Sequence, residues 1–201
     1  MRSAFREILE TIVLTVLIFL LVRAVVQNFK VEGHSMEPTL YDGQYLLINK
    51  ALYWQLDLKP VADLWPALVT SEGSTVNLFR APSRGDVIVF KAPQSPERDF
   101  IKRIIGLPGE RVEIRNGKVF VNGRALSEPY IKDPPLYEMP LLVVPDGSYF
   151  VLGDHRNNSS DSHVWGVVPR DNIVGAAWIS YWPPAKWGII SAAPLRASGQ
   201  Y

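Results

Sequence analysis

The 201-residue sequence predicts a mostly β protein, in which an antiparallel β-sheet domain follows one N-terminal transmembrane α-helix. Three observations predict this class. The chain opens with a long apolar segment, later apolar runs have the length of strands, and two of these runs flank an Asn-Gly turn. The 16 prolines and 14 glycines are spread along the chain, which favours many turns and short strands over a helical bundle. The length suits one main domain.

The first thirty residues contain the apolar segment. Its charge-free core, residues 11 to 22, is short for a bilayer. Extended to Phe29, the segment holds one charge, Arg23, and forms about 28 Å of helix at ~1.5 Å per residue. Arg23 lies near one end, where its long side chain reaches the lipid headgroups. We therefore expect a membrane anchor over residues 1–30, with a transmembrane helix over about 8–29.

Two other interpretations of this segment stay open. A cleaved secretory signal is disfavoured, because Glu10 precedes the apolar core and no small-x-small site follows it. A buried helix of a soluble core is the second alternative. Charge does not orient the segment, since two arginines on one side are balanced by Arg23 and Lys30 on the other.

The rest of the chain, residues 31–201, is predicted to form one β-rich domain. The strongest local signal is Asn116-Gly117 within ERVEIRNGKVFVNG, because Asn-Gly favours a two-residue turn between antiparallel strands. Further strands are predicted at QYLLINK (44–50), DVIVFK (86–91), FIKRIIGL (100–107), SYFVLG (148–153) and NIVGAAWIS (172–180). Their succession without helical alternation predicts antiparallel pairing.

Residues 51–83 break the strand pattern and are expected to form an insertion, an excursion or lid on the β domain. Trp54 and Trp65 lie in it among prolines and apolar residues. A second aromatic concentration comprises Trp178, Tyr181, Trp182 and Trp187. Aromatic clusters suit membrane interfaces and peptide grooves, and packing in a core is the commoner explanation, so both interpretations stay open.

Composition excludes several classes of function. Lys and Arg number 21 against 20 Asp and Glu, so the net charge of +1 makes nucleic acid a poor candidate partner. The absence of cysteine excludes disulfides, thiolate catalysis and cysteine-based zinc sites. We expect neither a metal nor an organic cofactor.

The octet GHSMEPTL, residues 33–40, places Ser35 between the anchor and the first predicted strand. A serine is a weak nucleophile at neutral pH and needs a base. A Ser-His-Asp arrangement stays open, because the chain holds His34, His155, His163, Asp154 and Asp161. His34 is disfavoured as the base, since adjacent side chains point apart in an extended segment.

Lysine is the other candidate base. In the strand FIKRIIGL, Lys102 shares a face with Phe100 and Ile104, and Arg103 shares the other face with two isoleucines. Apolar surroundings disfavour charge, and lysine can respond by losing its proton whereas arginine effectively cannot. Lys102 is therefore a candidate base. An ordinary strand lysine on a solvent-exposed face is the alternative.

A third polar concentration is GDHRNNSSDSHVWG, residues 153–166, which is too rich in Asp, Asn and Ser to be a strand interior. A solvated loop is the default expectation. The segment directly follows the predicted strand SYFVLG, however, and a rigid strand can present loop side chains to a site. A hydroxyl there can orient a neutral amine, and an aspartate can pair with a cation.

Taken together, these segments resemble the bacterial type I signal peptidases, membrane-anchored serine proteases that remove signal peptides from exported proteins. GHSMEPTL resembles the nucleophile segment of that family, RGDVIVFK its following strand, FIKRIIGLPGE its lysine segment and GDHRNNSSDSHVWG its late polar segment. The anchor before them and SYWPPAKWG after them extend the resemblance over nearly the whole chain. Residues 51–83 and about 125–145 stand out as variable insertions.

The resemblance implies a catalytic dyad with Ser35 as nucleophile and Lys102 as general base. It implies that the Ser159 hydroxyl helps to orient the lysine amine. Supporting polar contacts are implied for Arg103 with Asp154, and for Asp161 with the residue two places on. The implied fold is an antiparallel β-sheet catalytic domain of the signal peptidase I type.

Three positions depart from a common form of the family pattern. Gly33 stands where some members have a serine that helps to stabilise the oxyanion, so the backbone amide of Ser35 is the surest donor. His155 stands where asparagine is frequent. His163 stands where arginine is usual, which predicts a pH-dependent contact with Asp161 because histidine titrates near neutrality.

The resemblance implies a monomeric enzyme of the plasma membrane that cleaves N-terminal signal peptides after small-x-small sites. Its catalytic domain is expected on the outer face, with preprotein signal peptides and the lipid bilayer as partners. One alternative is a membrane-anchored, non-catalytic β-rich protein that binds peptides or assembles a complex. A self-cleaving repressor of the related serine and lysine type is disfavoured, because the N-terminus lacks room and basic character for a DNA-binding domain.

Overall fold

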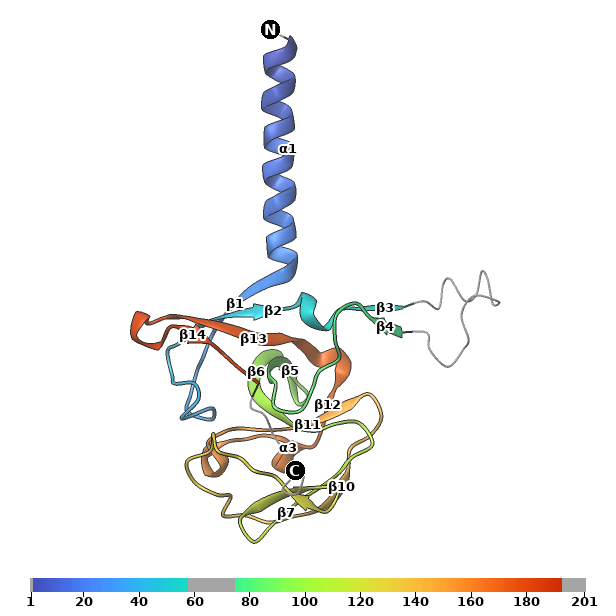
Figure 1. The fold of residues 1–201 in the computed structure, drawn as a ribbon, viewed down its shortest axis with the longest axis vertical. Helices are drawn as coiled ribbons and strands as arrows, with labels where there is room; N and C mark the ends of the chain where they lie inside the picture. Colours follow the sequence, from blue (N-terminus) through green and yellow to red (C-terminus); the bar gives the residue numbers. More distant parts are fainter. Residues whose placement is uncertain (1, 58–74, 193–201) are drawn as a thin grey trace, which may run out of the picture.

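Helix α1 (Arg2–Val25) projects as one long rod from a β-rich body (Figure 1). This computed structural model describes residues 2–57 and 75–192. The 20 residues Arg6–Val25 are long and apolar enough to cross a membrane, and no residue of their most apolar window is buried in the described structure. The large apolar side chains from Ile8 to Val22 are 50–60% exposed, so the alternative of a buried core helix is wrong.

The helix ends at Val25 rather than at about residue 29, so the predicted C-terminal boundary is wrong. Strand β1 (Val26–Lys30) follows at once and pairs antiparallel with β2 (Tyr45–Asn49) along its whole length. The Lys50 amide donates a hydrogen bond to the Val25 carbonyl at 2.8 Å, which satisfies the end of the helix. The apolar run of the helix continues into β1. Residues 26–30 form a strand rather than a helix because they pair with β2.

The main sheet has eight strands within the described residues, in the order β1-β2-β13-β5-β6-β11-β12, with β14 paired to β13 (Figure 1). Its other members are β5 (Val87–Ala92), β6 (Ser95–Gly106), β11 (Ser148–Leu152), β12 (Val168–Pro169), β13 (Ile173–Trp182) and β14 (Gly188–Ile189). The pairings are antiparallel, which confirms the predicted fold class. Strand β13 lies between β2 and β5. A strand from the C-terminal part of the sequence thus connects β1 and β2 with β5 and β6.

A four-stranded sheet, in the order β10-β7-β8-β9, forms the end of the body away from α1 (Figure 1). It comprises β7 (Arg111–Arg115), β8 (Lys118–Val121), β9 (Arg124–Ala125) and β10 (Met139–Val143). The predicted hairpin is confirmed, because Asn116 and Gly117 both have positive φ, 50° and 69°, as the favoured two-residue turn requires. Short helical turns are η1 (Ala51–Tyr53), η2 (Arg156–Asn158), α3 (Ser162–Trp165), η3 (Arg170–Asn172) and η4 (Pro184–Lys186).

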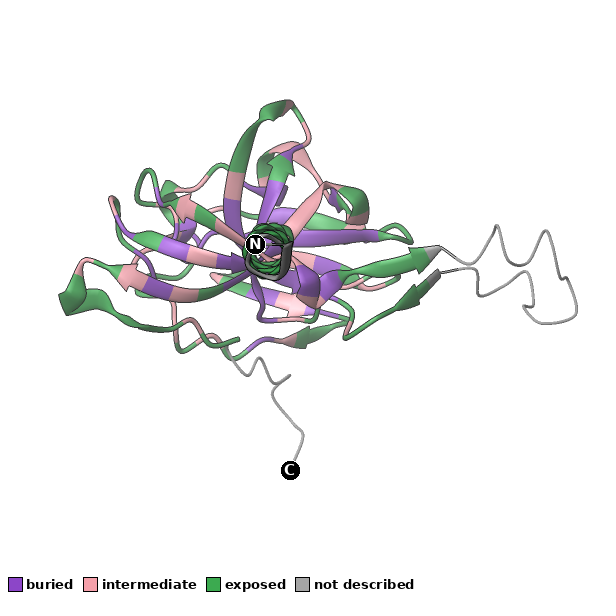
Figure 2. Ribbon diagram, turned by 90° about the horizontal axis from the view of Figure 1, so that it is seen from above, coloured by how far each residue is buried: buried purple, intermediate pink, exposed green. Residues whose placement is uncertain are grey.

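Both faces of the main sheet are covered by apolar side chains. In β5, Val87 and Val89 pack in one buried cluster with Met36, while Ile88 and Phe90 pack in another. This alternation explains why the β5 sequence is a continuous apolar run. Figure 2, viewed along α1, shows buried residues on the strands of the body beneath the helix, whose residues 6–24 are exposed.

The predicted insertion forms a two-stranded ribbon in its described parts. Strands β3 (Gln55–Asp57) and β4 (Thr75–Asn77) pair antiparallel, and the predicted excursion over residues 58–74, with Trp65, lies outside the described residues. The core-packing interpretation of the C-terminal aromatics is wrong for three of them. Trp178, Trp182 and Trp187 are 44%, 53% and 74% exposed.

Candidate active site

Ser35 lies in the turn that connects β1 to β2. The Val31 amide donates to the Gln44 carbonyl at 2.8 Å, which closes the base of this turn. Met36 and Leu40, at 1% and 2% exposure, anchor it in the core. A loop with such apolar anchors holds its hydroxyl in a fixed position.

The structure brings Lys102 to Ser35 across 67 residues of sequence. Lys102 Nζ lies 2.7 Å from Ser35 Oγ, and it also donates to the Ile101 carbonyl at 3.0 Å. Lys102 is 5% exposed, so the alternative of a solvent-exposed strand lysine is wrong. Burial lowers the pKa of Lys102 from 10.5 to about 8, against the opposing influence of Asp161 and Asp154. A usable fraction of neutral amine therefore exists near neutral pH, within reach of the hydroxyl proton.

A Ser-His-Asp arrangement is not formed. All three histidines lie within the described part of the chain, and none of them contacts Ser35 Oγ. Their ring nitrogens instead contact Glu37 (from His34, 2.8 Å), the His34 carbonyl (from His155, 3.3 Å) and Asp161 (from His163, 2.6 Å). Lys102 is therefore the candidate base that the geometry supports.

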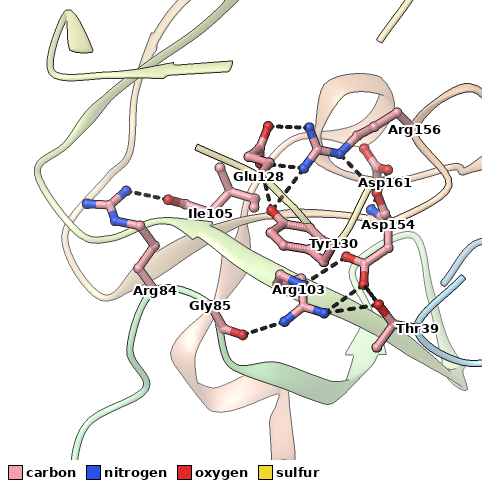
Figure 3. Close-up of polar contacts among 11 residues, drawn as sticks. Thr39, Arg84, Gly85, Arg103, Ile105, Glu128, Tyr130, Asp154, Arg156 and Asp161 are labelled. Carbon is pink, nitrogen blue, oxygen red and sulfur yellow. Dashed lines mark hydrogen bonds and ion pairs between the residues drawn. The ribbon is translucent and has the colours of Figure 1, made fainter. Parts of the chain in front are cut away.

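The residue next to Lys102 forms a buried ion pair (Figure 3). Arg103 Nε and Nη2 donate to the two carboxylate oxygens of Asp154, at 2.9 and 2.7 Å. Arg103 Nη1 donates to the Gly85 carbonyl, and the Thr39 hydroxyl donates to Asp154. Because Thr39 belongs to the nucleophile segment, this pair ties that segment to β6 and to the end of β11.

A second buried cluster adjoins the first and was missed by sequence reasoning (Figure 3). Arg156 donates to both carboxylate oxygens of Glu128, and the Tyr130 hydroxyl donates to the same carboxylate at 2.6 Å. The Arg103 guanidinium lies over the Tyr130 ring, 4.2 Å from its centroid. Burial raises the pKa of Tyr130, so its hydroxyl stays a donor. Glu128 and Tyr130 fall in the segment expected to be a variable insertion, where no motif marks them.

Asp161 organises the loop after β11 and is fully buried. Its side chain accepts hydrogen bonds from the Gly153 amide at 2.9 Å and from the His163 amide at the start of α3. The His163 ring contacts the same carboxylate and stacks on Tyr137, with ring centroids 3.9 Å apart. The structure thus places Asp161 with the residue two places on, as the resemblance implies.

Ser159 lies near Ser35 but does not contact the lysine. Its hydroxyl is buried and has no hydrogen-bond partner among the described residues, so the implied contact to Lys102 is absent in this structure. A Cβ atom built on Gly153 would lie 2.2 Å from Ser159 Oγ and 2.5 Å from the Ser35 carbonyl oxygen. Only glycine at position 153 lets the two serine segments approach so closely.

The amide of Ser35 is the available donor for an oxyanion. It makes no hydrogen bond within the described chain, whereas the Gly33 amide already donates to Asp42 at 2.8 Å. Gly33 adopts a φ of +89°, which favours glycine, and the space around it is open. The nucleophile segment therefore offers the free Ser35 amide beside the hydroxyl and leaves room for a peptide backbone.

A cavity of about 350 Å³ opens onto the Ser35 and Lys102 side chains. Its other walls include Phe29 of β1 and both Phe100 and Ile101 of β6. Strand β1 is an edge of the main sheet, and β11 pairs with β6 only from Arg103 onward. Unpaired backbone edges therefore flank the cavity, as required for binding an extended peptide.

Comparison with known proteins places these features in a family. A family model described as signal peptidase, peptidase S26, matches residues 5–182. The probable signal peptidase I-1 of Synechocystis sp. is 39% identical over 165 residues, covering 79% of this chain and 72% of that protein. The signal peptidase I of Leptolyngbya laminosa is 37% identical over 200 residues, covering 96% and 87%.

A crystal structure of a signal peptidase I from Enterococcus faecalis V583 is also similar, with a TM-score of 0.42 and 35% identity. It corresponds to 48% of this chain and 97% of that chain. The family model and the relative from Leptolyngbya laminosa both span the segments that carry Ser35 and Lys102. The chain therefore belongs to the signal peptidase family, peptidase S26.

Proposed function

We propose that this chain is a membrane-bound serine endopeptidase that cleaves N-terminal signal peptides from exported preproteins after small-x-small sites. The observation that carries the proposal is the 2.7 Å separation of Ser35 Oγ from the buried amine of Lys102. Family membership supports the reaction class. The exposed apolar helix α1 supports attachment to a membrane.

The substrate binds as an extended strand in the cavity beside Ser35. The free edges of β1 and β6 supply backbone donors and acceptors, and a substrate peptide satisfies them by pairing. Phe29, Phe100 and Ile101 provide an apolar wall for small side chains next to the scissile bond. We expect this apolar wall to favour small apolar side chains beside the scissile bond, as cleavage after small-x-small sites requires.

The acylation step needs only groups of this chain. Neutral Lys102 removes the proton of Ser35 as the serine oxygen attacks the scissile carbonyl carbon, and the Ser35 amide stabilises the oxyanion. The C–N bond then breaks, and protonated Lys102 gives its proton to the leaving amine. The signal peptide is left as an ester on Ser35.

Deacylation repeats the same proton transfers with water. Lys102 removes a proton from the attacking water, and the serine oxygen recovers it when the ester bond breaks. The Arg103–Asp154 ion pair and the contacts of Asp161 position strand β6 and the nucleophile segment relative to each other for both steps. Ser159 orients the amine when Lys102 is neutral, from its buried position against the nucleophile segment.

The membrane anchor concentrates enzyme and substrate together. A preprotein that is still held in the bilayer by its signal peptide meets a site tethered to the same bilayer, which raises the effective concentration. We place the domain of residues 31–201 on the outer face of the plasma membrane, where exported chains emerge. The enzyme acts there as a monomer.

A direct test is the full-length chain reconstituted in lipid vesicles with a preprotein that carries a small-x-small site. General-base removal costs ~10²–10⁴ in rate, so Lys102→Arg and Lys102→Ala are expected to lose about a thousandfold. Lys91→Arg, the same exchange at an exposed position on the neighbouring strand, is the matched control and should leave the rate unchanged. Cleavage retained by Lys102→Arg would overturn the lysine-base assignment, and a wild-type chain without activity would favour the non-catalytic alternative.

A further inference from the structure

Tyr130 lies between two buried arginines that belong to different parts of the active site (Figure 3). The guanidinium carbon of Arg103 lies 4.2 Å from the centroid of the Tyr130 ring, and that of Arg156 lies 5.9 Å from the same centroid. Both arginines are 1% exposed. A guanidinium within about 6 Å of an aromatic centroid is attracted to the ring, and more strongly where water is excluded. One ring therefore contacts two buried cations.

Arg103 belongs to the side of the site that carries the base. It follows Lys102 in β6, and its guanidinium donates to the Asp154 carboxylate at 2.7 Å and to the Gly85 carbonyl at 2.8 Å. The Tyr130 ring is a further contact of the same guanidinium. These contacts fix the backbone of β6 at the position next to Lys102.

Arg156 belongs to the side of the site that carries the nucleophile. Its Nε donates to the Gly153 carbonyl at 3.1 Å, which fixes the loop after β11. From the same loop, the His155 amide donates to the Ser35 carbonyl at 3.0 Å. A displacement of Arg156 would therefore move the loop against which the backbone of Ser35 rests.

The Tyr130 hydroxyl orients the ring. It donates to the Glu128 carboxylate at 2.6 Å and accepts a hydrogen bond from Arg156 Nη2 at 3.1 Å. Glu128 also accepts a hydrogen bond from Arg156 Nη1 at 2.8 Å, so these two residues stay paired without the hydroxyl. The contact with Arg103, in contrast, depends on the ring alone.

We propose that Tyr130 is a positioning residue, whose ring couples Arg103 to Arg156 and thereby sets the separation of Ser35 Oγ from Lys102 Nζ. With the ring in place, the base strand and the loop that contacts the nucleophile cannot shift independently. Misplacement of reacting groups by about 1 Å can cost on the order of 10²-fold in rate, so a contact far from the substrate can matter for turnover. The inference rests on the proposed function, because cleavage is what reports the separation.

The test compares Tyr130→Leu, which removes the ring, with Tyr130→Phe, which keeps the ring and removes the hydroxyl. Phe120→Leu is the matched control, since the Arg115 guanidinium lies 3.9 Å from the Phe120 centroid in the hairpin of β7 and β8. Each full-length variant is reconstituted in lipid vesicles, and kcat and KM are measured for a preprotein with a small-x-small site. Rates are normalised to the folded fraction, taken from a urea unfolding curve, so that a loss of stability alone does not lower kcat.

We expect kcat of Tyr130→Leu to fall roughly thirtyfold with KM changed less than about twofold, because the dyad is displaced and the substrate cavity is not. Tyr130→Phe should keep kcat within about threefold of wild type, and Phe120→Leu should match wild type. A wild-type kcat in Tyr130→Leu would overturn the proposal, as would a change confined to KM. Equal losses in the Leu and Phe variants would assign the effect to the hydroxyl and overturn the role of the ring.

Two further outcomes are distinguishable from these. If Tyr130→Leu does not fold, Tyr130→Met fills the space with a flexible side chain that lacks an aromatic face, and the same kcat loss is expected. Failure of both variants to fold would make Tyr130 a structural residue and overturn the proposal. A wild-type chain that does not cleave the preprotein would refute the proposed function itself, and this inference with it.

Discussion

Arg103 and Asp154 form a two-point ion pair with both residues 1% exposed, one position along β6 from Lys102. Arginine stays charged when buried, whereas the neighbouring lysine can release its proton. Two neighbouring basic residues of one strand thus differ in their electrostatic environment. Asp154 provides the counter-charge for Arg103, whereas burial lowers the pKa of Lys102 because its cost is not fully compensated by Asp161 and Asp154.

Removing one partner of this pair should destabilise the fold. Asp154→Asn leaves the Arg103 guanidinium buried without its counter-charge, and we expect the free energy of unfolding to fall by about 3 kcal/mol. Urea unfolding of the full chain in detergent measures the change. Glu113→Gln, which removes the partly exposed partner of the exposed Arg115, is the control and should change stability by less than about 0.5 kcal/mol. Equal effects of the two variants would contradict the structural role of the pair.

The pH dependence of cleavage follows from the lysine. Because the neutral amine is the base and burial lowers its pKa to about 8, activity should increase about tenfold per pH unit below that value and level off above it. The measurement is kcat/KM for a preprotein between pH 5 and pH 9. A rise in kcat/KM centred near the ordinary histidine pKa of ~6.5 would instead indicate an imidazole base.

Lys102 should be a source of instability as well as of catalysis. Its pKa lies below the unfolded value of 10.5, so the unfolded state binds more protons between about pH 8 and pH 10.5, and stability rises with pH there. Below pH 8 the full cost of the buried charge is present, on the order of 3 kcal/mol. We expect Lys102→Met to be inactive but about 2 kcal/mol more stable at pH 7, after allowing for lost hydrogen bonds. Urea unfolding at pH 7 and pH 10 tests this, because the gain should shrink at the higher pH.

The histidines should be dispensable for the chemistry. His155→Ala and His163→Ala are expected to keep at least about a tenth of wild-type cleavage, since neither ring reaches Ser35 and neither takes its proton. The preprotein assay used for Lys102 is the measurement. Near-total loss from either variant in a folded protein, judged by its urea unfolding curve, would restore the histidine alternative.

The variant Ser159→Ala distinguishes a catalytic role of the Ser159 hydroxyl from a structural one. Its buried hydroxyl lacks a partner in the described chain, so Ser159→Ala removes an unsatisfied group and should not lower the free energy of unfolding. If the hydroxyl orients the neutral amine of Lys102, kcat should still fall, by roughly tenfold, with KM unchanged. Measuring kcat, KM and stability on one preparation distinguishes the two roles. An unchanged kcat would remove Ser159 from the mechanism.

The sequence predicted those features that depend on local pattern or on ordered motifs. Strand runs and the Asn116-Gly117 turn are confirmed because alternation and turn chemistry act over a few residues. The resemblance named Ser35 and Lys102, which the structure brings together. Strand β1 was missed because its apolar residues continue the helix pattern, and only pairing with β2 decides its conformation.

The buried cluster of Glu128, Tyr130 and Arg156 was beyond prediction for a different reason. Its members are held together by charge and ring contacts between separate segments, and although Arg156 lies in the late polar segment, Glu128 and Tyr130 lie in no recognisable motif. The exposure of the tryptophans could not be predicted from the sequence either. Burial depends on which surfaces the fold brings together, and composition alone favoured the core for Trp178 and Trp187.

The place of β13 in the main sheet has a consequence for the timing of activity. Ala176 of β13 pairs with Asn49 of β2 on one side and with Ile88 of β5 on the other, so β13 is the backbone link between the sheet halves that carry Ser35 and Lys102. Residues 173–182 leave the ribosome after every residue of the dyad. Nucleophile and base therefore come into register only after residues 173–182 have been synthesised, so a chain that still lacks β13 has not yet assembled its dyad.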